Sequence, residues 1–291
     1  MTDSTDYKAI DAVVNIWNRE ALSHRPNWGD EFFVDKMNAA NDLMKPLEID
    51  QLVETLDEAG IDKAFLIAAY SGRPGLPGCY HMPYEVVAKA IEQYPDRFYG
   101  LAGIDPFDGM NGVKAFEDAV TNMGFIGAHL YPHWYNMEPG HAKLYPFYAK
   151  CWELDVPIQM QVGQSMIYSK DYPCISPAKP ITLDQIACDF QELKIIGIHV
   201  GIPWVDEMIA MAWKHPNVYI GCDAHRPKYW PKEFIQYINS FGQDKVLFGT
   251  DYPVLPFKRT IEDIDALGLK PQVRRKLLRD NTIRVYDLDN K

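Results

Sequence analysis

The chain alternates short apolar segments with amphipathic segments eight times, and this alternation restricts the folds open to it. The short segments are apolar on both faces, as strands of a covered parallel sheet must be; they are Ala9–Ile16, Lys63–Ala68, Tyr99–Ile104, Ile126–Tyr131, Ile158–Val162, Ile195–Val200, Val218–Cys222 and Val246–Gly249. The amphipathic segments repeat apolar residues at intervals of three and four, as helices do; they are Ile49–Glu58, Tyr84–Tyr94, Gly112–Asn122, Tyr145–Leu154, Leu183–Glu192, Trp204–Lys214, Lys232–Phe241 and Thr260–Leu267. This pattern predicts an α/β protein with a single (β/α)8 TIM barrel over residues 1–291, and an open doubly wound sheet is the alternative.

Two connections are much longer than the others: Asn18–Lys45 follows the first strand, and Gly163–Lys179 follows the fifth. Long connections in a compact domain are commonly functional. Both begin at the carboxyl end of a strand, where barrel enzymes build their active sites. We therefore expect a site at this end of the barrel, with loop aromatic residues such as Tyr168 in its wall.

The charge balance excludes one class of partner. The chain has 29 Lys and Arg residues against 40 Asp and Glu residues, a net charge of -11, which argues against nucleic-acid binding.

Segment Met1–Lys8 is polar, unlike a signal peptide, and no apolar run reaches the ~18 residues of a membrane span. The five cysteines are scattered without a CxxC pair, which is typical of reduced thiols. These features predict a cytoplasmic protein whose partner is a small-molecule substrate, with no nucleic acid and no membrane.

Polar residues where strands end are the candidate site residues, because the carboxyl ends of barrel strands converge. They are Asn15, His129, Gln161, Gln164, His199, His225 and Asp251, with Trp134 and Tyr168 as candidate pocket walls. His129 lies in an apolar run and is alternatively a core residue. Asp11 is expected either to accept backbone N–H bonds or to join the site. Asp223 also follows a strand, and capping of the next helix is the alternative role for it. His133 and His215 lie in loop or helix-end positions and are expected at the surface or as caps.

Four motifs resemble those of the amidohydrolase-related barrels. They are Ile195–Gly201 with Pro203 and Trp204, His215–Ile220, Val246–Pro253, and Lys276–Asn281. The resemblance covers nearly the whole chain and is strongest over Tyr145–Asp287. It implies a barrel enzyme, and the family includes aminocarboxymuconate-semialdehyde and resorcylate-type decarboxylases as well as lactonases. It also implies a homodimer.

The metal-dependent members of that family hold one divalent ion with a His-x-His pair on strand one, a His on strand five and an Asp on strand eight. A strand-six His lies beside this ion. Here Val13 and Asn15 align with the first pair, and Gln161 aligns with the strand-five ligand. Valine cannot bind a metal, and neutral amides are poor ligands beside imidazole. The sequence therefore predicts no cofactor, and a zinc or manganese ion held by His199 and Asp251 is the alternative.

The resulting functional prediction is a metal-independent hydrolase acting on a lactone or a small carboxylated or aromatic-derived compound. Asp251 would act as the base and His199 as the acid, since imidazole titrates near neutral pH. The substrate would be bound by Asn15, His129, Gln161, Gln164, His225, Tyr168 and Trp134. Two alternatives stay open: a lyase, of decarboxylase or retro-aldol type, and an inactive barrel that binds a small molecule.

Overall fold

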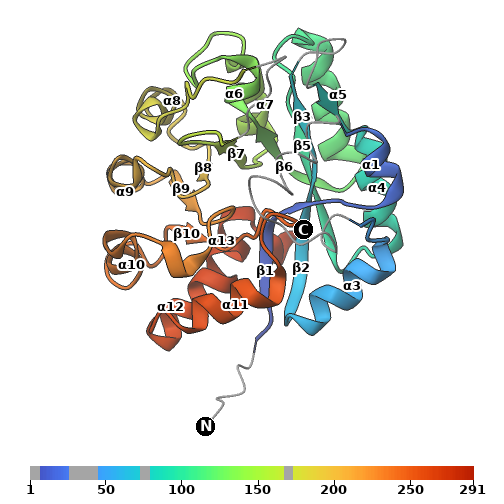
Figure 1. Cartoon of the computed structure of the whole chain (residues 1–291). Coiled ribbons are helices and arrows are strands. Elements are labelled where there is room, and N and C mark those ends of the chain that lie inside the picture. The colour runs from blue at the N-terminus through green and yellow to red at the C-terminus, as the bar shows by residue number, and fades with distance from the viewer. Residues whose placement is uncertain (1–6, 26–44, 73–78, 167–172) are drawn as a thin grey trace.

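The computed structural model describes residues 7–25, 45–72, 79–166 and 173–291. Its main sheet has eight parallel strands that neighbour one another in chain order (Figure 1). The strands are β1 (Ala9–Asn15), β2 (Ile61–Ala68), β5 (Phe98–Gly103), β6 (Phe125–Leu130), β7 (Ile158–Gln161), β8 (Ile195–Ile198), β9 (Val218–Gly221) and β10 (Val246–Leu247). Almost every residue in them is buried, because side chains point alternately into the barrel and toward the helices.

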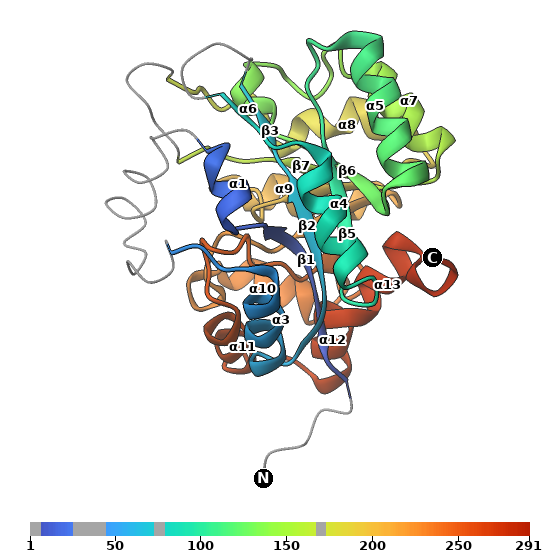
Figure 2. The same cartoon turned by 90° about the vertical axis from the view of Figure 1, so that its right-hand side faces the viewer.

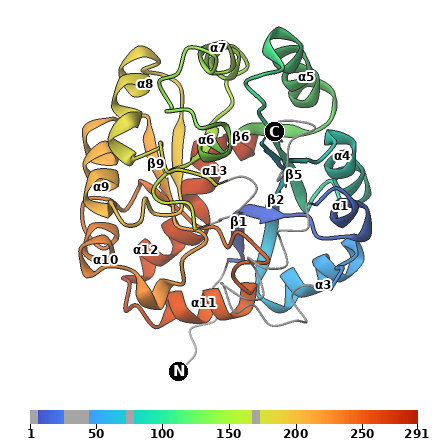
Figure 3. The same cartoon turned by 45° about the horizontal axis from the view of Figure 1, so that its top comes forward.

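Helices form an outer ring around these strands (Figure 3). They are α3 (Ile49–Glu58), α4 (Tyr84–Gln93), α5 (Gly109–Asn122), α7 (Tyr145–Glu153), α8 (Leu183–Asp189), α9 (Val205–Lys214), α10 (Lys232–Ile238) and α11 (Phe257–Asp265). Each turns one apolar stripe inward; in α3 the stripe is Ile49, Leu52 and Leu56. No helix among the residues with described structure is long and apolar enough to cross a membrane.

The barrel prediction is confirmed, and so are the individual elements. All eight expected strands are present with ends within two residues of those predicted, and the eight helices agree within three residues. The sequence pattern did not reveal the short elements: α1 (Arg19–Ser23), β3 (Tyr70–Ser71), β4 (Tyr80–His81), α6 (Pro132–Tyr135), α12 (Pro271–Arg275) and α13 (Asn281–Tyr286). These have too few residues for a periodic pattern to be visible. The extension of one domain over 1–291 stays a prediction.

The barrel closes through backbone bonds between β1 and the segment after β10. Strand β10 pairs with β9 through only two residues, Val246 and Leu247. Beyond it, the Asp251 N–H donates to the Val13 carbonyl at 2.8 Å, and the Asn15 N–H donates to the Tyr252 carbonyl at 3.0 Å. This closure places the end of β1 directly beside Asp251.

Asp11 reinforces the closure with its side chain. It is fully buried and accepts three hydrogen bonds: from the Thr250 N–H at 3.0 Å, the Thr250 hydroxyl at 2.7 Å and the Val13 N–H at 3.1 Å. The expectation that Asp11 accepts backbone N–H bonds is therefore confirmed. Its carboxylate links β1 to the end of β10 and belongs to the scaffold under the site.

The C-terminal segment forms the helices α12 and α13 and packs against the barrel; Figure 2 shows α12 close to the N-terminal part of β1. Tyr286 is buried, packs against Phe65 of β2 with ring centroids 4.7 Å apart, and accepts a hydrogen bond from Gln159 Nε2 at 2.8 Å. Asn281 Nδ2 donates to the Val246 carbonyl at 2.8 Å. The terminal Asn motif of the sequence is thus a structural connection to β10.

Replacing Asp11 with Ala should lower the free energy of unfolding by about 2–4 kcal/mol, because three donors lose a buried acceptor. Urea unfolding followed by circular dichroism measures the change. The exposed Glu58→Ala variant is the control and should stay within about 0.5 kcal/mol of the parent. An Asp11→Ala protein as stable as the parent would show that the hydrogen bonds accepted by Asp11 do not stabilise the closed barrel.

Candidate active site

Three consecutive strand ends deliver the central side chains of the site. His199 follows β8, Asp223 follows β9 and Asp251 follows β10. The backbone at His199 and Asp251 is left-handed, with φ of 71° and 54°, which is uncommon for residues other than glycine. Such strained conformations persist at functional sites when the surrounding structure imposes them. The strand ends therefore turn sharply at the residues that bear the functional groups.

The three side chains form a compact cluster. His199 Nε2 lies 3.3 Å from Asp223 Oδ2 and 3.8 Å from Asp251 Oδ2. The His199 N–H donates to Asp223 Oδ1 at 2.9 Å. Asp223 is fully buried, whereas the side chains of His199 and Asp251 are 13% and 15% exposed. His199 and Asp251 are thus the members of the cluster that solvent reaches.

Two amide side chains contact the cluster from neighbouring strands. Asn15 Nδ2 donates to Asp251 Oδ1 at 2.8 Å and to the Tyr252 carbonyl at 3.0 Å. The Gln161 amide lies 3.1 Å from His199 Nδ1. The structure therefore brings together four of the predicted site residues, Asn15, Gln161, His199 and Asp251, on adjoining strand ends.

The electrostatics of the cluster favour an added positive charge. Burial raises the pKa of Asp223 to about 7. Burial and then the charge of Asp223 raise the pKa of Asp251 well above its usual value, against the Asn15 hydrogen bond and the charge of Arg25, which lower it. Burial lowers the pKa of His199 to about 4. A cation would stabilise ionised carboxylates and neutral imidazole in this place.

The cluster also fits a divalent metal ion by its donor atoms. One atom each of His199, Asp223 and Asp251 lies within 4.8 Å of the others. Asp223 Oδ2 is buried and has no hydrogen bond of good geometry within the described part of the chain. Carboxylate oxygens suit manganese, and imidazole suits most first-row metals. Asp223 is the residue that the sequence analysis missed: it caps no helix, since the helical turn after it (Pro227–Tyr229) has Arg226 as its N-cap.

Further histidines surround the cluster. His129 is fully buried, and its Nδ1 lies 3.2 Å from Gln159 Oε1. His225 presents its ring edge-on to His199 at a centroid distance of 6.4 Å. His133 is buried, with Nε2 2.8 Å from the Gly163 carbonyl, so the expectation of a surface or capping position for it was wrong. Burial lowers the pKa of His129 to about 3 and that of His225 to about 4, so these rings stay neutral.

Arg25 is a second residue that the sequence analysis did not select. It follows α1, which Figure 2 shows near the carboxyl end of β1. Its guanidinium lies 3.4 Å from the centroid of the Trp17 ring and 5.2 Å from that of Tyr80. A cation stacked on aromatic rings beside the cluster is well suited to bind an anionic ligand. Arginines in long loops are common, which explains why no sequence signal marked this one.

The remaining residues singled out in the sequence have no described contact with the cluster of His199, Asp223 and Asp251. The Gln164 side chain is exposed, and Trp134 in α6 is buried. Tyr168 lies outside the described residues. His215 is buried at the C-cap of α9 and contacts Asp184 of α8 through Nε2 at 2.6 Å, so it connects these two helices. The substrate-binding roles of Gln164, Trp134 and Tyr168 stay predictions.

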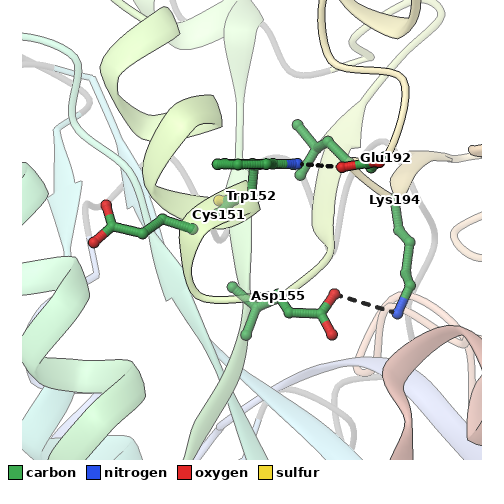
Figure 4. A pocket seen from close by; sticks show the side chains of 8 residues that line it. Cys151, Trp152, Asp155, Glu192 and Lys194 are labelled. Atoms are coloured by element: carbon green, nitrogen blue, oxygen red, sulfur yellow. Dashed lines mark hydrogen bonds and ion pairs between the residues drawn. The ribbon is translucent and has the colours of Figure 1, made fainter.

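A pocket of about 370 Å³ opens elsewhere on the molecule, between the end of α7 and the turn before β8 (Figure 4). Trp152 Nε1 donates to Glu192 Oε2 there at 2.9 Å, and Lys194 Nζ lies 3.8 Å from Asp155 Oδ1. Its lining residues precede β7 and β8, so the pocket lies at the amino ends of the strands. It is therefore separate from the cluster at the carboxyl ends.

A closed parallel barrel with carboxylate and imidazole groups at the carboxyl ends of its strands defines a class of barrel enzymes. Within that class the chain belongs to the amidohydrolase family, whose model matches residues 10–288. The resemblance inferred from the sequence motifs is thereby confirmed.

Curated relatives and solved structures give a consistent comparison. The chain is 23% identical over 247 residues to gamma-resorcylate decarboxylase of Rhodococcus jostii, covering 70% of this chain and 75% of that protein. The same enzyme of a Rhizobium species is 22% identical over 252 residues, covering 70% and 75%. An uncharacterized TIM-barrel protein of Bordetella bronchiseptica superposes with a TM-score of 0.79 at 24% identity, covering 98% and 100%. Manganese-bound 5-carboxyvanillate decarboxylase of Novosphingobium aromaticivorans superposes with a TM-score of 0.73 at 17% sequence identity, and the match covers 98% of each chain.

Two predictions are overturned by these findings. The hydrolase prediction is wrong, because the matching curated relatives are decarboxylases, which are lyases. The prediction of no cofactor is also wrong: decarboxylases of this fold hold manganese, and His199, Asp223 and Asp251 form a group able to hold a metal. The error came from treating Val13, Asn15 and Gln161 as the loss of the site, when Asp223, which follows β9, adds a carboxylate to the cluster.

Each buried neutral histidine should contribute less to the stability of the protein in mild acid, and His129 is the clearest case. The pKa of His129 is lowered from 6.5 to about 3 in the folded chain, so the unfolded chain binds a proton as the pH falls through 6.5 while the folded chain does not. The stability from this residue is therefore complete above pH 6.5 and decreases below it, by about 2 kcal/mol between pH 7 and pH 5. His129→Gln should remove that part of the pH dependence. Urea unfolding of both proteins at the two pH values measures it, and equal losses would contradict the buried neutral state.

Proposed function

We propose that this protein is a metal-dependent decarboxylase that removes the carboxylate of a small hydroxylated aromatic acid. The observation that carries the proposal is the cluster of His199, Asp223 and Asp251 at the strand ends, in a chain whose curated relatives decarboxylate resorcylate. Resorcylate and 5-carboxyvanillate, the compounds named for the relatives, are both benzoates with a ring hydroxyl group. We take this as the substrate class.

His199, Asp223 and Asp251 would hold the divalent ion, which supplies Lewis-acid stabilisation of substrate oxygen atoms when bound. Asp251 also moves the proton. Its side chain is 15% exposed, so its carboxyl group can contact a bound acid and deliver a proton to the ring carbon that bears the carboxylate. The bond from that carbon to the carboxylate then breaks, its electron pair restores the aromatic ring, and CO2 leaves. Solvent returns a proton to Asp251.

Arg25 binds the substrate carboxylate in this proposal. Its guanidinium is planar and held against Trp17 at 3.4 Å, an arrangement suited to bidentate contact with a carboxylate. Its positive charge lowers the pKa of Asp251, and we propose that both groups contact the same small aromatic acid. His225 stays neutral and can donate a hydrogen bond to the ring hydroxyl. The homodimer is part of the proposal by analogy with the family alone.

Activity toward 2,6-dihydroxybenzoate and related hydroxybenzoic acids tests the function, with CO2 release and the phenol product measured after manganese loading. Removing the metal with a chelator should abolish turnover, and manganese should restore it. A manganese-loaded protein that binds these acids and decarboxylates none would favour the inactive binding barrel and overturn the proposal.

Asp251→Asn should lower kcat by about 10²- to 10⁴-fold, because an amide cannot deliver the proton to the ring carbon. The matched control is Asp155→Asn, the same exchange at an exposed carboxylate of the pocket in Figure 4, which should leave kcat unchanged. Turnover is followed by the loss of substrate absorbance. Equal activity of parent and Asp251→Asn would exclude Asp251 as the proton donor.

Arg25→Met should raise KM for the aromatic acid by about 10- to 100-fold, since a charged hydrogen-bond pair is lost while the stem can still pack on Trp17. The inhibition constant of the phenol product, which has no carboxylate, should change little. Steady-state kinetics with product inhibition separates the two effects. A parallel loss of affinity for acid and phenol would point to a collapsed pocket wall instead of a carboxylate contact.

A further inference from the structure

We infer that the divalent ion is bound by His199, Asp223 and Asp251 alone among the side chains of the described strand ends, and that Asn15 and Gln161 orient these ligands without binding the ion. The inference rests on the proposed function for the presence of an ion. The ligand set itself follows from the geometry of these five side chains.

Each of the three ligands has one polar atom fixed by a hydrogen bond and one left facing the cluster. Gln161 contacts His199 Nδ1 at 3.1 Å, the His199 N–H holds Asp223 Oδ1 at 2.9 Å, and Asn15 holds Asp251 Oδ1 at 2.8 Å. The atoms left are Nε2 of His199 and the two Oδ2 atoms, which are those at 3.3 and 3.8 Å. Metal ligands in proteins are commonly oriented in this way through their second polar atom.

The orientation of Asn15 excludes it as a ligand. Its Nδ2 donates both to Asp251 Oδ1 and to the Tyr252 carbonyl, and a carbonyl only accepts. The amide nitrogen therefore faces the cluster, and an amide N–H has no lone pair to offer a metal. One polar atom of the Gln161 amide is likewise engaged with His199 Nδ1, at 3.1 Å, and this contact fits a residue that orients the imidazole.

Asp223 is the ligand with the strongest individual evidence. It is fully buried, and its Oδ2 has no hydrogen bond among the residues that the structure describes. A buried carboxylate oxygen without a donor is costly unless a cation satisfies it. Two carboxylates and one neutral imidazole balance the charge of a divalent ion. Three protein ligands also leave coordination positions open for substrate, as catalytic metal sites require.

A second group of residues in the described chain could compete for a metal: Asp184, Cys188 and His215. Asp184 already has the ammonium of Lys214 at 2.6 Å and His215 Nε2 at the same distance on the same oxygen. A metal there would have to displace a bound cation, whereas the cluster of His199, Asp223 and Asp251 has no ion pair with a Lys among the described residues. The second group serves as the internal control.

The test is titration of the metal-free full chain with Mn²⁺, in which electron paramagnetic resonance measures the free ion. The parent protein should bind about one equivalent. Asp223→Asn should weaken binding by more than about 100-fold, and Asn15→Leu and Gln161→Leu by about 10- to 100-fold each, as for residues that orient ligands. Cys188→Ser should bind as the parent does.

Unchanged binding by Asp223→Asn, or loss of binding by Cys188→Ser, would overturn the ligand assignment. Circular dichroism and thermal unfolding establish that each variant is folded. A second measurement avoids variants: electron spin-echo modulation of the Mn²⁺-loaded parent should show one coordinated imidazole nitrogen, and its absence would overturn the role of His199 Nε2.

These outcomes are separable from those of the proposed function. Mn²⁺ bound by the three ligands without decarboxylation of any hydroxybenzoic acid would contradict the function and leave the ligand assignment standing. Decarboxylation by an Asp223→Asn protein with parental Mn²⁺ affinity would contradict the ligand assignment and leave the function standing.

Discussion

The closure of the barrel between β1 and the segment after β10 is the constraint on which the rest of the structure depends. Eight parallel strands bury their backbone groups only when the first and last are joined, and β10 is too short to do this by its own ladder. The joining bonds run instead from Asp251 to Val13 and from Asn15 to Tyr252, with Asp11 beneath them. The same bonds that close the barrel therefore set the distance between Asn15 and Asp251, so the scaffold and the site share one set of contacts.

The fold was predictable from the sequence because its signal is repeated. Each of the eight apolar segments predicts a strand and each of the eight amphipathic segments predicts a helix, so an error in one segment would not have changed the predicted architecture. The site was predictable only where a residue follows a strand directly, as His199 and Asp251 do. Asp223 follows β9 in the same way but was assigned to helix capping, since Asp is common in both places. Arg25 lies in a long loop, whose path the local sequence does not determine.

The proposed metal site shows why metal ligands cannot be predicted by comparing one strand at a time. A position-by-position comparison finds Val13, Asn15 and Gln161 where ligands would stand and concludes that the ion is lost. In three dimensions the ends of β8, β9 and β10 adjoin, so a carboxylate on β9 can face the same point as its neighbours. The ion then needs no ligand from β1 or β7, and the polar residues on those strands can orient the ligands instead.

The orientation of the ligands explains why amide side chains suit positions 15 and 161. An imidazole at either position could bind the ion itself, whereas a carboxylate would add a charge to a cluster already holding two. An amide does neither: it donates to Asp251 or contacts His199 Nδ1 and leaves the net charge unchanged. An apolar residue such as Val13 is tolerated nearby because its side chain packs beneath Gly249 and no ligand depends on it. The pattern of amides and apolar residues is thus what a site centred on β8, β9 and β10 requires of the strands beside it.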